Sequence, residues 1–303
     1  MISTEDGMVA NNASSTKALV TVSIANTNNR PLLQRCLESL YQTCDTRTLD
    51  IYVVDNASRD DSVDMMKSLF PAVNIIARED RGSYAENQNL ILKHVETPYV
   101  WILNEDTVIG EGVLDEMLAV MRQNARVGIA GVTILNPDGS LQPTCMRFPS
   151  IHQYVLKRWF GWTWRFRKND RIPFSGNLSA QAHRRAQYVD WVNGASRLVR
   201  REVIDGIGLL DECLPIFYEE TDQARLAQAT GWACFYSPRG HVWHVQGASR
   251  RDRPERERMQ RVLREGTYYY FRKHHGLIAA SIIQLSDALH ERIVRGIRRG
   301  LSK

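Results

Sequence analysis

Residues 99–110, YVWILNEDTVIG, contain an apolar run that ends abruptly in polar side chains. The length of the run at residues 99–103, with its β-branched and aromatic side chains, predicts a buried strand. Asn104, Glu105 and Asp106 follow it directly. Carboxylates at the end of a buried strand are costly unless something binds them. Asp106 could cap the next helix, or it could hold a divalent cation that carries a diphosphate.

Two other predicted strands also end in polar side chains. ALVTVSIAN, residues 18–26, ends at Asn26, and LDIYVVDN, residues 49–56, ends at Asp55 and Asn56. Asp55 and Asn56 could form a turn or hydrogen-bond to a nucleotide. Because ligands of open α/β sheets bind outside the carboxyl ends of the strands, we expect these side chains to share one site.

The elements that position these residues alternate along the first half of the chain. Amphipathic helices are expected at residues 30–42, 59–70 and 83–95, and further strands at residues 72–78 and 99–104. Alternation at this spacing predicts an α/β fold with a parallel sheet and helices on both faces.

The second half is less regular. ILNPDGSLQ predicts a hairpin around Asp138 and Gly139, and residues 189–201 and 233–245 predict strands. YEETDQARLAQATGW predicts a helix that begins with acids, which the helix dipole favours, and ends at a glycine.

Composition narrows the class of protein. Hydrophobic residues make up 43% of the 303-residue chain, as in a globular protein, and the net charge is only +5. The five scattered cysteines contain no CxxC pair, so they support neither a zinc site nor a disulfide framework and fit a reducing cytoplasm. Residues 1–17 are polar, lack a secretory leader pattern and are expected to form a flexible tail. No apolar run is long enough to span a bilayer.

Seven segments occur in the order found in glycosyltransferase family 2, and they are VVDNASRDDS, YAENQN, WILNEDT, VDWVNGASRLVRREV, YEETD, TGW and HVWHVQGAS. The chain resembles that family over roughly residues 18–275, and most of all its bacterial rhamnosyltransferase-type branch. The resemblance implies the GT-A fold, with a Rossmann-like, mostly parallel sheet. It divides the chain into a nucleotide-sugar-binding half at residues 18–135 and an acceptor-binding, catalytic half at 136–253, before basic amphipathic helices at 254–303.

The resemblance also implies residue roles on the donor side. It places the pocket for the base and ribose at Asn26 and Asp55, and it makes Asp106 the last acid of a DXD-like motif that binds Mg²⁺ or Mn²⁺. Asn104 replaces the first acid of that motif. His244 corresponds to a histidine that completes the metal site, although a buried core histidine is the alternative. The residues expected to bind the nucleotide-sugar are Asn26, Asp55, Asn56, Asn104 and Glu105.

On the acceptor side, the resemblance makes Glu220 the catalytic base. An acceptor hydroxyl must lose its proton as it attacks, and a positioned carboxylate can take it. The alternative is an acid-rich helix start. Trp191 would stack on a sugar or be buried in the core. The residues expected to face the acceptor are Asp190, Trp191, Glu219 and Asp222.

Two basic stretches remain. Residues 156–171 interleave aromatic and basic side chains, which suits a membrane interface, a loop packed on the protein surface or, less well, nucleic acid. Residues 276–303 predict a basic amphipathic helix. That helix could pack on its own domain, on a second copy in a homodimer, or on an anionic membrane surface.

We therefore predict a cytoplasmic, membrane-peripheral, metal-dependent inverting glycosyltransferase with Mg²⁺ or Mn²⁺ as cofactor. Its expected partners are a nucleotide-sugar donor, a saccharide or lipid-linked acceptor and the anionic inner face of the cell membrane, and not nucleic acid. The favoured donor is dTDP-rhamnose, with a UDP-hexose or UDP-N-acetylhexosamine as the alternative. A sugar-nucleotide-binding scaffold without catalysis is the rival of another class.

Overall fold

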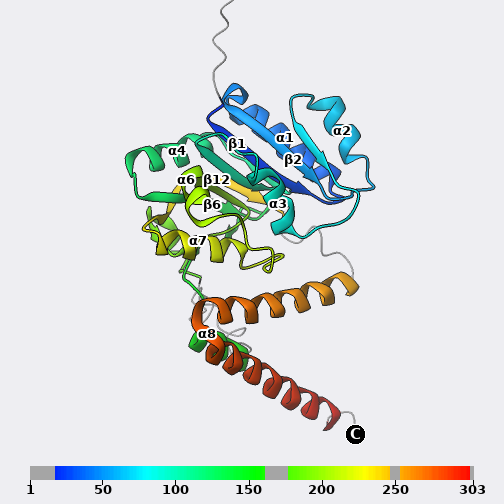
Figure 1. The fold of residues 1–303 in the computed structure, drawn as a ribbon, viewed down its shortest axis with the longest axis vertical. Helices are drawn as coiled ribbons and strands as arrows, with labels where there is room; N and C mark the ends of the chain where they lie inside the picture. Colours follow the sequence, from blue (N-terminus) through cyan, green and yellow to red (C-terminus); the bar gives the residue numbers. More distant parts are fainter. Residues whose placement is uncertain (1–17, 161–176, 246–252, 301–303) are drawn as a thin grey trace, which may run out of the picture.

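The computed structural model describes residues 18–160, 177–245 and 253–300, with side chains omitted at residues 253–256 and 298–300 (Figure 1). The expected flexible tail and most of the aromatic, basic stretch at residues 156–171 lie outside this part of the chain.

A large mixed sheet forms the centre of the fold, and its strand order is β3-β2-β1-β4-β11-β6-β12-β5. Strands β1 to β4 run parallel, as the alternating sequence predicts. Strand β11 lies antiparallel between β4 and β6, and β12 runs parallel to β6. The strands are β1 (Val20–Asn26), β2 (Leu49–Asp55), β3 (Asn74–Ala77), β4 (Tyr99–Asn104), β5 (Thr107–Ile109), β6 (Val127–Leu135), β11 (Ser196–Arg200) and β12 (Ala233–His244).

Apolar layers cover both faces of this sheet. Along β4, Trp101 and Leu103 point into one buried cluster, whereas Val100 and Ile102 point into the other. This explains why the strand is apolar throughout rather than alternating. Helices α1 (Arg30–Thr43), α2 (Ser62–Leu69) and α4 (Val113–Gln123) cover the first face, and α3 (Tyr84–Leu92), α6 (Arg201–Ile207) and α7 (Glu219–Ala229) cover the second.

The predicted hairpin is present, because β6 turns through Gly139 into β7 (Leu141–Gln142). The strand predicted at residues 189–201 is wrong as a single element. It divides into β10 (Trp191–Val192), which pairs with β8 (Cys145–Met146), and β11, and its last residue opens α6. The break falls at Gly194, where a Cβ atom would lie 3.0 Å from Arg197 Nη1. Glycine permits this close approach between backbone and side chain.

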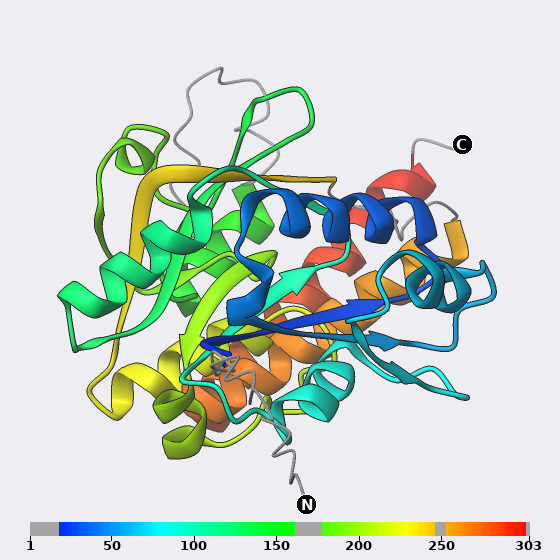
Figure 2. The ribbon, with the colours of Figure 1, turned by 90° about the horizontal axis from the view of Figure 1, so that it is seen from above.

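The C-terminal helix α8 (Arg253–Gly300) is interrupted at Gly276, which has φ 86° and ψ 173°. We call residues 253–275 its N-terminal half and residues 277–300 its C-terminal half. In Figure 1 the C-terminal half projects away from the sheet beside α5 (Ile151–Phe160), and Figure 2 shows the orange N-terminal half next to the yellow α7. A third apolar cluster, which includes Leu214, Tyr270 and Phe271, joins α8 to the rest of the protein.

Candidate active site

Asn26 and Asp55 lie side by side at the carboxyl ends of β1 and β2, where the sequence predicts a binding site. Both are almost fully buried, with 0% and 2% of their surface exposed. Asn26 Nδ2 donates to Asp55 Oδ1 over 3.0 Å, and Asp55 Oδ2 accepts from the backbone of Ser58 over 3.0 Å. Asn26 Oδ1 is buried and has no hydrogen-bond partner among the described residues. A buried acceptor of this kind favours a ligand that brings a donor.

Asn56 connects two loops at the same edge of the sheet. Its Oδ1 accepts from the backbone of Gly82 over 2.7 Å, and its Nδ2 donates to the Gly82 carbonyl over 3.1 Å. The sequence left open whether Asn56 forms a turn or hydrogen-bonds to a nucleotide. In the structure its side-chain amide holds the backbone just before α3. Asn56 therefore shapes the site rather than offering a free side chain to it.

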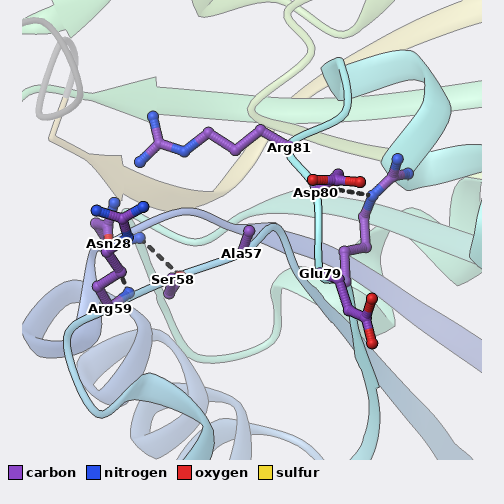
Figure 3. Close-up of a pocket in the computed structure, with 8 residues that line it drawn as sticks. Asn28, Ala57, Ser58, Arg59, Glu79, Asp80 and Arg81 are labelled. Carbon is purple, nitrogen blue, oxygen red and sulfur yellow. Dashed lines mark hydrogen bonds between the residues drawn. The ribbon is translucent and has the colours of Figure 1, made fainter.

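A cavity of about 720 Å³ opens beside these residues, between the loops that follow β1, β2 and β3 (Figure 3). Figure 3 shows the Arg81 side chain extending across toward Asn28 and Arg59, which lie on the loops after β1 and β2, while Glu79 points away. The cavity is lined by three arginines and two acids, and this excess of positive charge suits an anionic ligand. The lining residues are Asn28, Ala57, Ser58, Arg59, Arg78, Glu79, Asp80 and Arg81.

Asp106 and His244 meet at the end of β4, although they come from different halves of the chain. Strand β5 pairs antiparallel with β12, and this register sets His244 opposite Thr107. Asp106 Oδ1 lies 3.1 Å from His244 Nε2, and Asn104 Nδ2 lies 3.4 Å from the same nitrogen. The structure thus brings together three residues that the sequence assigned to a metal and diphosphate site.

Gln142 fixes the orientation of the His244 ring. Its Oε1 lies 2.9 Å from His244 Nδ1, and its Nε2 donates to the His244 carbonyl over 2.8 Å. Because Oε1 can only accept, we assign the proton to Nδ1, which leaves the Nε2 lone pair facing Asp106. Ligand histidines are commonly oriented by such a contact from their second nitrogen.

The donors around Asp106 fit a cation that brings its own oxygen ligands. Within residues 18–160, 177–245 and 253–300, no group of three His, Cys, Asp or Glu side chains is arranged to hold a metal ion. Asp106 and His244 supply one carboxylate and one imidazole, so a bound cation needs further oxygens of the kind a diphosphate provides. Burial, and then the charge of Asp106, raise the pKa of Glu105 to about 7.

Glu219 and Glu220 open helix α7 on the other side of the site. Burial raises the pKa of Glu219 well above its ordinary value, and the Glu220 carboxyl acts in the same direction. Oε2 of each residue is buried with no hydrogen-bond partner in the part of the chain that is described. The buried Arg197, which donates to Gln223 and to the Gly194 carbonyl, opposes the rise in the Glu219 pKa.

Tyr84 contacts the end of β4. Its hydroxyl donates to Asn104 Oδ1 over 3.3 Å. Burial raises the pKa of the Tyr84 phenol, the charge of Arg197 lowers it, and the carboxyls of Glu219 and Glu220 raise it further. The phenol therefore lies at the expected diphosphate site. The backbone of Asn104 also donates to the Ala195 carbonyl over 3.0 Å, next to Gly194, where a Cβ atom would lie 3.4 Å from Glu220 Oε1. This segment joins the end of β4 to the expected base.

The other residues expected to face an acceptor make contacts within the protein. Asp190 Oδ2 accepts from the backbone of Phe148 over 2.8 Å, and the Trp191 indole donates to the Arg147 carbonyl over 3.0 Å. Trp191 is half-buried. Asp222 differs from the acceptor contact that we expected, because it is 2% exposed and both of its oxygens are held by α8.

Several residues of the site were not identified from the sequence. Gln142, the cavity arginines and the α8 side chains near Asp222 carry no local pattern that marks them, because their roles depend on strand pairing and on packing between distant segments. Arg197 had a weak signal, since an arginine in the apolar run of a buried strand is unusual. Tyr84 lay within a quoted segment, YAENQN, but without an assigned role.

The chain is similar to known proteins in sequence and in fold. Residues 21–185 match the family Glycosyl transferase family 2. The chain is 25% identical over 231 residues to the N-acetylglucosaminyl-diphospho-decaprenol L-rhamnosyltransferase of Mycobacterium tuberculosis, and the match covers 72% of this chain and 73% of that protein. An uncharacterized protein of Sinorhizobium fredii is 23% identical over 269 residues, which is 82% of this chain and 27% of that protein.

Solved structures share the fold at low sequence identity. The mannosyltransferase PcManGT from Pyrobaculum calidifontis, in complex with GDP-Man and Mn²⁺, has a TM-score of 0.57 at 17% identity, covering 90% of this chain and 70% of that chain. GalNAc-T7 with UDP, GalNAc and Mn²⁺ has a TM-score of 0.58 at 14% identity, covering 87% and 52%. These similarities confirm the predicted GT-A fold.

Proposed function

The chain belongs to glycosyltransferase family 2, and from this premise we propose that it moves a sugar from a nucleotide-sugar donor to a saccharide or lipid-linked acceptor. The observation that carries the proposal is the segment Gly194–Ala195, which joins the two sides of the site. The backbone of Asn104 donates to the Ala195 carbonyl over 3.0 Å, and a Cβ atom at Gly194 would lie 3.4 Å from Glu220 Oε1. A donor diphosphate at the end of β4 and an acceptor hydroxyl at the start of α7 would then face each other, as transfer requires.

The donor nucleoside is proposed to bind over Asn26 and Asp55. The Asp55 carboxylate can accept from a pyrimidine N3–H or a ribose hydroxyl, which gives a selectivity that an apolar pocket lacks. The neighbouring cavity, with Arg59 and Arg81 in its wall, suits the negative charge of a nucleotide.

A divalent cation, Mg²⁺ or Mn²⁺, is proposed to be held by Asp106 and His244 together with the diphosphate. When bound, it would offset the charge that develops on the leaving diphosphate. Asn104 and Glu105 border this position, and Gln142 keeps the His244 lone pair directed at it. The structures of PcManGT and GalNAc-T7 contain Mn²⁺, which supports the choice of metal.

Glu220 is proposed as the general base. It would take the proton of the acceptor hydroxyl as that oxygen attacks the anomeric carbon, so displacement is direct and inverts the configuration. A Cβ atom at Gly194 would lie 3.4 Å from Glu220 Oε1, so the absent side chain leaves room beside the carboxylate. We retain Glu219, Asp190 and Trp191 as proposed neighbours of the acceptor.

The favoured donor sugar is L-rhamnose, carried by dTDP, and the acceptor is a lipid-linked saccharide. Support comes from the name of the mycobacterial relative, which pairs an L-rhamnosyl donor with an N-acetylglucosaminyl-diphospho-decaprenol acceptor. A UDP-hexose or UDP-N-acetylhexosamine is the alternative. The intact Asp106–His244 pair and the α7 acids favour transfer over a scaffold that binds donors without catalysis.

We also propose that the C-terminal half of α8 rests on an anionic membrane surface. The structure contains no helix in its described residues that is long and apolar enough to cross a bilayer. The C-terminal half instead exposes large apolar side chains in a stripe, with Ile278 79% and Leu285 70% exposed. Its acids are turned inward, because Asp287 and Glu291 form ion pairs with Arg158 of α5.

A panel of nucleotide-sugars tests the proposed activity. Purified protein is mixed with Mn²⁺ and each donor, and the melting temperature is measured. With a lipid-linked saccharide acceptor added, the transfer of the sugar to the acceptor and the release of the nucleoside diphosphate are measured. We expect dTDP-rhamnose to give the largest shift and a rhamnosylated product. The Asp106→Asn variant should keep the fold but lose the Mn²⁺-dependent part of the shift. Binding of donors without any transfer would favour the scaffold.

A further inference from the structure

We propose that the N-terminal half of α8 is a positioning element for the catalytic base, and that it acts through Lys273 and His274 on Asp222. The inference rests on the proposed role of Glu220. Asp222 lies two positions after Glu220 in the first turn of α7. A residue that holds Asp222 therefore also determines where the Glu220 carboxylate lies.

The contacts at Asp222 are short, and its carboxylate is buried although the Lys273 side chain is 28% exposed. Lys273 Nζ donates to Asp222 Oδ2 over 2.9 Å, and His274 Nε2 lies 2.6 Å from Oδ1. The Asp222 side chain is 3% exposed and that of His274 10%. Both carboxylate oxygens of one residue in α7 are thus held by two neighbouring residues of α8. A buried carboxylate without these partners would be strongly destabilised.

Lys273 also holds the loop that leads into α7. Its Nζ donates to Asp211 Oδ2 over 2.7 Å, and the Tyr269 hydroxyl donates to the same oxygen over 2.9 Å. Asp211 lies near the start of the loop between α6 and α7, and Asp222 lies just beyond the end of that loop. One ammonium group therefore joins the two ends of the segment that delivers Glu219 and Glu220 to the site.

The backbone before the base is held in an unusual conformation. Phe217 and Tyr218 both have left-handed φ angles, 64° and 67°, which side chains other than glycine rarely adopt. Such residues persist only when the surroundings hold them. The Tyr218 ring lies 4.9 Å from that of Tyr270, and its hydroxyl accepts from Thr267 over 3.3 Å. Both partners belong to the N-terminal half of α8.

These observations predict a defect in turnover rather than in donor binding. The residues that line the donor cavity lie in the loops after β1, β2 and β3, and none of them belongs to α7 or α8. Loss of the Lys273 ammonium would leave Asp222 buried without its counter-charge beside two other acids. The first turn of α7 would then shift, and a displacement of the base by about 1 Å can cost on the order of 10²-fold in rate.

The test compares Lys273→Met with Lys273→Arg and with Arg272→Met, an exposed neighbour that removes the same charge. We expect kcat of Lys273→Met to fall roughly 10–100-fold. The donor Kd, measured by calorimetry, should be unchanged, Lys273→Arg should recover part of the loss, and Arg272→Met should match the wild type. In a double-mutant cycle, Asp222→Asn should add little to Lys273→Met, because both remove one interaction.

Two outcomes would overturn the inference. One is wild-type kcat in Lys273→Met, and the other is additive losses in the cycle, which would mean that Lys273 acts without Asp222. If Lys273→Met does not fold, kcat is measured for two other variants. One is the double variant Asp222→Asn with Lys273→Met, and the other is the single variant His274→Gln. Neither variant leaves a buried charge of Asp222 without a partner. Full turnover in Glu220→Gln would refute the proposed base itself, independently of any α8 variant.

Discussion

Gln142 Oε1 accepts from His244 Nδ1 over 2.9 Å, and this single contact decides which ring nitrogen faces Asp106. Gln142 is 3% exposed and lies in the β7 strand of the hairpin, whereas His244 ends β12. Its amide also donates to Asn136 Oδ1 over 2.8 Å, so neither end of the side chain can turn without losing a bond. The hairpin therefore holds the His244 ring of the proposed metal site in place.

The Gln142→Leu variant should bind the metal ion more weakly, although the two proposed ligands, Asp106 and His244, are unchanged. Loss of such a supporting contact typically costs roughly 10–100-fold in metal affinity. Mn²⁺ affinity in the presence of a nucleoside diphosphate can be measured by electron paramagnetic resonance, without reference to turnover. Gln142→Glu, which keeps the acceptor oxygen, is the matched control and should retain more affinity. Equal Mn²⁺ binding by wild type and Gln142→Leu would contradict the assigned tautomer.

The base can be identified by a pair of isosteric changes. Glu220→Gln keeps the shape of the side chain but cannot take a proton, so turnover should fall by about 10²–10⁴-fold while donor binding persists. Glu219→Gln should be milder. Single-turnover rates with saturating donor separate the chemical step from binding. If Glu219→Gln proves the more damaging change, the assignment is wrong by one residue.

Stability should depend on pH through Glu219. Burial, and then Glu220, raise its folded pKa above the ordinary value of 4.5, so the folded state holds the proton more tightly than the unfolded chain. This contribution to stability is complete below pH 4.5 and is lost as pH rises through the folded pKa. The Glu219→Gln side chain does not ionise, so this variant does not lose stability in that way as pH rises. Its melting temperature should exceed that of the wild type at pH 8 and show no such gain at pH 4.

Scanning calorimetry across that range checks the prediction. Glu202→Gln serves as a control, because Glu202 also lies in the first turn of a helix of the same half but is exposed. A melting temperature of Glu219→Gln at or below the wild-type value at pH 8 would show that the carboxylate is stabilised, by Arg197, more strongly than burial penalises it.

The parallel half of the fold was predictable because its determinants are local. Apolar runs of strand length ended in polar side chains at Asn26, Asp55 and Asn104, and the rule for open sheets placed these ends together. The second half of the fold was less predictable from the sequence. The break of the predicted strand at Gly194 depends on the position of Arg197, which the sequence around it does not specify.

The role of Asp222 was missed for a related reason. Asp222 and its neighbours Glu219 and Glu220 all belong to one acid-rich helix start. The local sequence therefore could not show that Asp222 forms ion pairs with another helix. Its partners are Lys273 and His274, which reach α7 only because the C-terminal helix folds back against it. Long-range pairing of this kind leaves no periodic signal.

The exposed stripe of the C-terminal half of α8 is expected to bind anionic vesicles. One face of this helix is used within the protein, where Ala279 and Ile283 are buried, whereas Ile278 and Leu285 are largely exposed on another face. Arg292 and Arg295 are exposed on the same half. Each basic residue near an anionic membrane contributes on the order of 1 kcal/mol, and salt screens that attraction.

Replacing Ile278 and Leu285 together by Gln should therefore lower vesicle binding by roughly 10²–10⁴-fold, since full burial of each such side chain is worth about 1.5–3 kcal/mol. Leu263→Gln is the matched control, because Leu263 is 40% exposed on the N-terminal half of α8. Cosedimentation with vesicles containing anionic lipid, at low and high salt, measures binding, and donor affinity should stay the same in all variants. Equal binding by the double variant and the wild type would exclude the stripe as the membrane contact. A change in sedimentation equilibrium mass without vesicles would instead identify it as the interface of a homodimer.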